Sequence, residues 1–91
     1  MTPEQTSSGR NDTQAVLELV CNERGEQDAK WGEQNHDMHK WLTILMEEVG
    51  EAAERALNND AECYGQELIQ VAAVAVAAVE CLNRQAKGRG E

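Results

Sequence analysis

Four side chains in the middle of the chain could together bind a divalent cation, and a fifth, Glu47, is their neighbour in the sequence. Glu47, Glu48 and Glu51 fall within one predicted helix, and Glu67 and Gln70 fall within the next. At about 100° per residue, Glu48 lies on the edge of the apolar stripe of its helix, with Glu51 about 60° further round. Glu67 and Gln70 are three residues apart and share a helix face. Antiparallel packing of the two helices would bring the oxygens of all but Glu47 into one pocket.

Magnesium is the expected occupant of such a pocket. Crowded carboxylates repel one another and raise each other's pKa unless a divalent cation keeps them ionised. Mg²⁺ prefers oxygen ligands, keeps several waters and commonly bridges protein carboxylates to substrate phosphates, and we expect Mn²⁺ to substitute for it. The alternative is a solvated helix face, in which Arg55 pairs with Glu51 at the i, i+4 spacing. Spacing alone favours this alternative, because charge clusters on helices are common.

The composition indicates one helical domain with an acidic surface. The chain has 91 residues, enough for a single domain, and only 3% of them are aromatic, so Ala, Val, Leu and Ile must build the core. A formal net charge of −9 repels the phosphates of DNA and RNA, so we expect no nucleic-acid partner. A smaller phosphate-bearing ligand would need metal cations to neutralise it.

The cysteines and the first residues bear on the cellular compartment. Cys21, Cys63 and Cys81 are odd in number and form no CxxC motif, which argues against both a disulfide framework and a zinc site. Residues 1–11 contain no apolar stretch of the kind that a secretory signal requires. We therefore expect reduced thiols and a cytoplasmic location.

Helical periodicity predicts three main helices, which makes the fold class all-α. Asn11 and Asn59 each have capping-box spacing, with Gln14 and Glu62 respectively, and therefore mark predicted helix starts. Between them, apolar residues recur at spacings of three and four. We predict helices over residues 12–28, 38–58 and 59–84, with a loop at residues 30–36.

The limits of the domain follow from these elements. Residues 1–10 are polar and aperiodic, which predicts a disordered N-terminal tail. A single all-α domain is then expected over residues 11–86. Residues 87–91 are expected to form a short C-terminal tail.

Residues 68–79 are apolar on every face of the third predicted helix, apart from Gln70. Such a helix must be surrounded on all sides, which two partner helices of one chain cannot do. A membrane span would need about 20 apolar residues, and this run ends at Glu67 and Glu80, so we expect no membrane partner. A buried strand is the competing interpretation. We predict a homo-oligomer, either a homodimer or a dimer of dimers, whose protomers complete a four-helix-bundle core.

Two segments of the chain resemble the core of the MazG-like nucleoside triphosphate pyrophosphohydrolases, an all-α family. They are WLTILMEEVGEAAERAL and ELIQVAAVAVAAVECL, and the preceding KWGEQNH also fits the family. The resemblance covers about residues 23–83 and rests on an EExxE motif followed by a second pair of ligands on the next helix. It implies hydrolysis of a nucleoside or deoxynucleoside triphosphate between its α and β phosphates, as part of nucleotide-pool house-cleaning.

The resemblance also implies a role for each motif position. Glu48, Glu51 and Glu67 would hold Mg²⁺, and we expect Glu47 to orient or deprotonate the attacking water. The last motif position is usually Asp in the family, whereas this chain has Gln70, which offers a neutral amide oxygen. A non-catalytic, all-helical interaction module, descended from such an enzyme, is the alternative function that Gln70 and the short chain would permit.

Further substrate contacts are expected near the loop before the second predicted helix. Trp31 could stack on the base or pack in the core, and the sequence favours neither. Gln34 and Asn35 carry amides, which present paired donor and acceptor groups to a base edge. Lys30 and Arg55 are the cations best placed to reach phosphate oxygens.

Overall fold

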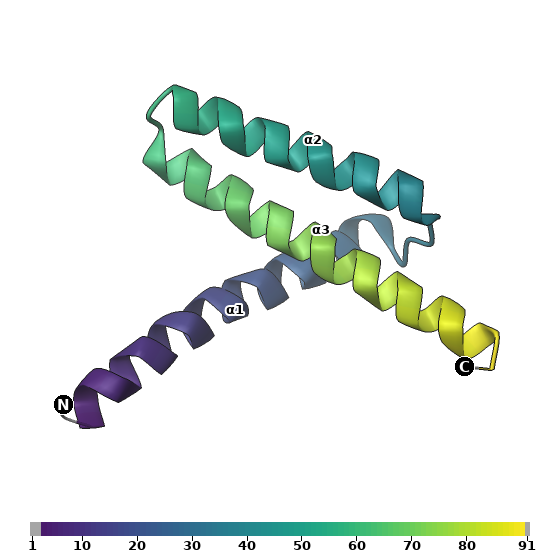
Figure 1. Cartoon of the computed structure of the whole chain (residues 1–91), viewed down its shortest axis with the longest axis horizontal. Helices are drawn as coiled ribbons and strands as arrows, with labels where there is room; N and C mark the ends of the chain where they lie inside the picture. The colour runs from purple at the N-terminus through teal and green to yellow at the C-terminus, as the bar shows by residue number, and fades with distance from the viewer. Residues whose placement is uncertain (1–2, 91) are drawn as a thin grey trace.

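The chain folds into three α-helices, as its periodicity predicts. The computed structural model describes the backbone of residues 3–90 and the side chains of residues 11–90. The helices are α1 (Pro3–Trp31), α2 (Met38–Leu57) and α3 (Ala61–Gly88), and residues 3–90 contain no strand. α2 and α3 form an antiparallel hairpin, and α1 crosses α3 (Figure 1). The competing interpretation of residues 68–79 as a strand is therefore wrong.

α1 is longer than the sequence predicts. It begins at Pro3, so it includes residues 3–10 of the predicted disordered tail, while Met1 and Thr2 lie outside the described residues. Proline suits the first turn of a helix because the N–H that it lacks would have no partner there. Gly25 lies within α1, since a glycine lowers helix stability by only about 1 kcal/mol relative to alanine.

The other helix boundaries also differ slightly from the prediction. The loop between α1 and α2 covers residues 32–37, so its first predicted residues belong to the last turn of α1. α3 continues to Gly88, past the predicted end at residue 84, because the following residues contain no helix breaker before that glycine. The predicted C-terminal tail at residues 87–91 therefore begins within a helix, and Glu91 lies outside the described residues.

Aspartate side chains cap the first turns of α2 and α3. Asp37 Oδ1 accepts a hydrogen bond from the Lys40 backbone N–H at 2.8 Å, and Asp60 Oδ1 accepts one from the Cys63 N–H at 3.1 Å. Each bond satisfies a helix N–H that has no partner within the helix. Asp60 replaces the predicted cap Asn59, whose φ of 55° places it in the turn, in a left-handed conformation that asparagine tolerates.

The core lies between α2 and α3 and is small. Trp41 of α2 and Val74, Ala77 and Cys81 of α3 are each no more than 8% exposed. Small side chains on α3 allow the two helices to pack closely. This packing sets how the polar side chains along the edges of α2 and α3 face one another.

Large apolar side chains remain exposed on one face of the hairpin. Six apolar residues of α2 and α3 line a groove of about 320 Å³, and we call them the apolar face: Met38, Leu42, Leu45, Ala78, Val79 and Leu82. Leu42 is 58% exposed and Val79 55%. An apolar face of this kind typically marks a contact with another molecule. The predicted homo-oligomer would cover it, and that assembly stays a prediction.

α3 is the one helix of the described chain that is long and apolar enough to cross a membrane, judged by length and composition. The core helix of a soluble protein satisfies the same test when it is mostly buried, whereas 22% of the apolar window of α3 is buried within this single chain. Glu67, Gln70 and Glu80 interrupt its apolar sequence, so the longest apolar run is shorter than the roughly 20 residues of a typical span.

Candidate metal centre

Three of the predicted carboxylates come together between α2 and α3. Glu48 and Glu51 lie about one turn apart on α2, and Glu67 approaches them from the antiparallel α3. One carboxylate oxygen of each residue lies within 4.8 Å of the other two. Glu48 and Glu67 are half-buried, and Glu51 is exposed. Three carboxylates at this separation, accessible from solvent, are a donor set suited to a hard cation that retains several waters. We call these residues the glutamate triad.

Burial and crowding raise the pKa of two members of the triad. Burial raises the pKa of Glu48, and the nearby carboxylates of Glu51 and Glu67 raise it further. Burial and a hydrogen bond with Glu51 raise the pKa of Glu67, against the opposing effect of the Arg55 cation. A divalent cation would relieve this repulsion and hold the carboxylates in their ionised form. Charge and donor chemistry therefore both fit Mg²⁺ or Mn²⁺.

We expect these raised pKa values to make the metal-free protein less stable as the pH rises. A carboxyl group with a raised pKa stabilises the fold at pH values below its ordinary pKa of 4.5. This contribution is lost as the pH rises through the folded-state pKa. In EDTA, Glu48→Gln should therefore unfold at a higher temperature than the wild type at about pH 8, but not at about pH 4. Thermal unfolding followed by circular dichroism measures this difference.

Added metal supplies the control for this prediction. Saturating Mg²⁺ at about pH 8 should stabilise the wild type more than Glu48→Gln, because a ligand stabilises only the state that binds it. A difference in unfolding temperature that is the same at both pH values would contradict the proposed coupling within the triad.

A cavity of about 290 Å³ opens beside the triad. All three helices and the loop at residues 32–37 contribute to its walls. Glu48 and Gln70 both line it, so Gln70 shares the cavity wall with one residue of the triad. Trp41, Ile44 and Val74 add apolar walls. The cavity thus combines a carboxylate group at one place with an apolar lining elsewhere, as ligand sites commonly do.

Two of the predicted substrate contacts, Trp31 and Gln34, line this cavity. Trp31 is 56% exposed, which argues against the alternative that it packs in the core. The Lys30 ammonium nitrogen lies 4.7 Å from the centroid of the Trp31 ring, within cation–π distance. The side-chain oxygen of Gln34 lies 3.1 Å from His36 Nε2. Trp31 and Gln34 therefore line the same cavity as Glu48.

The remaining predicted site residues do not line the cavity. Asn35 is exposed, and Arg55 lies close enough to Glu67 to influence its pKa. Lys30 lies outside the cavity wall, with its ammonium group over the Trp31 ring. Glu47 is exposed and lines a separate hollow on the outer side of α2, although its charge contributes to the raised pKa of Glu48.

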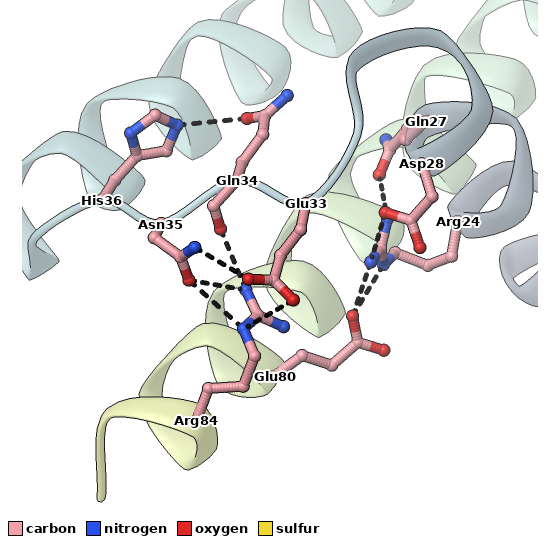
Figure 2. A network of polar contacts seen from close by, with 9 residues as sticks. All are labelled: Arg24, Gln27, Asp28, Glu33, Gln34, Asn35, His36, Glu80 and Arg84. Carbon is pink, nitrogen blue, oxygen red and sulfur yellow. Dashed lines mark hydrogen bonds and ion pairs between the residues drawn. The ribbon is translucent and has the colours of Figure 1, made fainter. Parts of the chain in front are cut away.

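A polar network between α1 and α3 contributes residues that the sequence analysis missed (Figure 2). Arg24 Nε donates to Glu80 Oε1 at 3.2 Å, and its Nη1 donates to Gln27 Oε1 at 3.1 Å. Arg24 also forms an ion pair with Asp28 at 3.0 Å. All four residues line the cavity, and Gln27 is only 9% exposed. The i, i+4 spacing of Arg24 and Asp28 was the available signal, but such pairs are common on solvated helices.

Comparison of the chain with known protein families, with characterised proteins and with solved structures finds no match.

Proposed function

We propose that the chain is an Mg²⁺-dependent pyrophosphohydrolase, which cleaves a nucleoside or deoxynucleoside triphosphate into a monophosphate and pyrophosphate. The observation that carries this proposal is the glutamate triad. One carboxylate oxygen of each member lies within 4.8 Å of the other two, and the triad adjoins a cavity through Glu48. The volume of about 290 Å³ is near the lower end of the range for small-molecule sites. The resemblance of the two motif segments to MazG-like enzymes supports the same reaction.

The charge of the protein supports a metal-dependent reaction. A triphosphate is strongly anionic, and the chain has a formal net charge of −9. Within the cavity, Glu48 adds negative charge. Both arginines of the lining are already paired, Arg24 with Glu80 and Asp28, and Arg84 with Glu33. Binding of a triphosphate beside the triad therefore requires cations that neutralise both partners.

The proposal assigns distinct roles to the two ends of the cavity. Glu48, Glu51 and Glu67 would hold Mg²⁺, which when bound polarises phosphate oxygens and lowers the pKa of a coordinated water. At the other end, Trp31 would stack on the base and the Gln34 amide would hydrogen-bond to its edge. Glu47 is the remaining carboxylate close to the triad, and its role in orienting the water stays a prediction.

We also propose that the protein acts in the cytoplasm as a homodimer or a dimer of dimers. The exposed apolar face of the α2–α3 hairpin supports self-association, because a second copy would remove that face from water. A four-helix core formed by two hairpins would use the packing that is general for helix bundles.

Product analysis by ³¹P NMR tests the proposed reaction. The protein is incubated with Mg²⁺ and a panel of nucleoside and deoxynucleoside triphosphates, with EDTA as the control. We expect monophosphate and pyrophosphate, and no turnover in EDTA. Orthophosphate with a diphosphate would show cleavage at a different bond. Absence of turnover with every substrate would instead favour the non-catalytic helical module.

A further inference from the structure

A single arginine of α3 fastens the loop at residues 32–37 (Figure 2). Arg84 Nη2 donates to the Gln34 backbone carbonyl at 3.0 Å. The same guanidinium donates to Asn35 Oδ1, from Nε at 3.2 Å and from Nη2 at 3.0 Å. Because the guanidinium is planar and carries several donors, it holds two successive loop residues in a defined orientation.

The neighbouring loop residues strengthen this attachment. Arg84 Nε lies 3.5 Å from Glu33 Oε1, and the Asn35 amide nitrogen donates to Glu33 Oε2 at 2.9 Å. Gln85 Nε2 donates to the His36 backbone carbonyl at 3.3 Å. Both ends of the Asn35 amide are thus bonded within the protein, so we assign Asn35 to the attachment of the loop and not to the recognition of a base.

Gln34 is held differently from Asn35. Its backbone carbonyl points toward Arg84, whereas its side chain extends on the other side of the loop toward the His36 ring (Figure 2). The His36 ring in turn packs edge-on against Trp41, with 4.9 Å between the ring centroids. Gln34, which belongs to the cavity lining, is therefore restrained through its backbone and through its side chain.

We infer that Arg84 is a positioning residue that sets base selectivity, by holding the Gln34 amide in one orientation at the cavity wall; this inference rests on the proposed function. An amide distinguishes bases through the donors and acceptors on their edges, and it does so only when its own orientation is fixed. Arg84 itself lines the cavity next to Gln34, and it lies about 25 Å from Glu67 along α3. Its effect should therefore fall on binding of the base and not on the metal.

The test measures selectivity in two ways. Affinities for non-hydrolysable α,β-methylene analogues of the four common deoxynucleoside triphosphates are read from the fluorescence of Trp31 and Trp41. In parallel, kcat and KM are measured for the hydrolysable triphosphates. Arg84→Ala should reduce the affinity ratio between the best and worst base by about tenfold. KM for the preferred base should rise, while kcat and the Mg²⁺ requirement should change by less than about twofold.

Three further variants separate positioning from a general structural effect. Arg84→Lys should retain only part of the selectivity, because a flexible ammonium group lacks the planar, fixed donors that hold both acceptors in one orientation. Gln34→Ala should lose the same selectivity with Arg84 intact. Lys87→Ala removes an exposed cation from the next turn of α3 and should leave the ratio unchanged. Circular dichroism checks that each variant keeps the helical content of the wild type.

The outcomes distinguish this inference from the proposed function. An unchanged affinity ratio in folded Arg84→Ala or in Gln34→Ala, or a wild type that does not discriminate among the analogues, would overturn the inference. A third outcome is a wild type that binds the analogues selectively but hydrolyses none of the triphosphates, with the selectivity lost in Arg84→Ala. It would uphold the inference and refute the proposed reaction.

Discussion

Glu51→Gln should lower the rate of Mg²⁺-dependent triphosphate hydrolysis by about a hundredfold or more. The substitution keeps the size of the side chain and replaces a charged metal ligand with a neutral one. Lewis-acid stabilisation by a bound metal contributes several kcal/mol to the transition state, so a weakened site loses a large part of the rate. Glu51 also raises the pKa of both Glu48 and Glu67, so its replacement changes the electrostatics of the whole triad.

The dependence of the rate on Mg²⁺ concentration provides the second measurement for Glu51→Gln. The concentration needed for half-maximal activity should rise, because the variant offers one carboxylate fewer. Glu54→Gln is the matched control, since it makes the same chemical change at an exposed position on the same helix outside the triad. Full activity of Glu51→Gln with an unchanged Mg²⁺ requirement would show that the triad is not the metal centre.

Leu42→Glu should convert the protein from an oligomer into a monomer at micromolar concentration. Leu42 is 58% exposed and belongs to the apolar face of the hairpin. In a symmetric dimer, the substitution would bury an unpaired carboxylate from each copy. If burial of the two carboxylates costs about 4 kcal/mol in total, the association constant of the dimer falls roughly a thousandfold. Sedimentation velocity of the wild type and the variant measures this change directly.

A second leucine on the same helix supplies the control for oligomerisation. Leu57→Glu introduces the same charge at a side chain that is 82% exposed and lies outside the apolar face. It should sediment as the wild type does. A monomeric wild type at about 100 μM, with the helical content unchanged on dilution, would show that the apolar face does not mediate self-association.

The helices and the triad could be predicted because both depend on local periodicity. Two amphipathic helices joined by a short turn pack their apolar stripes together, and polar groups along the edges of those stripes then meet. Glu48, on the edge of its stripe, and Glu67, on the next helix, were therefore expected to approach one another. Helix ends were predicted less well, because capping motifs such as that of Asn11 also occur inside helices.

The cavity and its polar network could not be predicted in this way. They depend on where α1 crosses α3, which brings together Arg24 and Glu80 from positions 56 residues apart. A crossing of this kind results from the summed packing of many side chains, and no local spacing encodes it. The same limit applies to Arg84 and Asn35, which are 49 residues apart.

Gln34 and Asn35 show this division most clearly, because they carry the same functional group at adjacent positions. The amide group and the loop that carries it follow from residue types and local breakers, so both residues were equally good candidates for contact with a base. Their separation into a cavity-lining residue and a loop attachment depends on the approach of α3, whose Arg84 occupies one side of the loop. Residue chemistry is a local property, but the surroundings in which it acts are created by long-range packing.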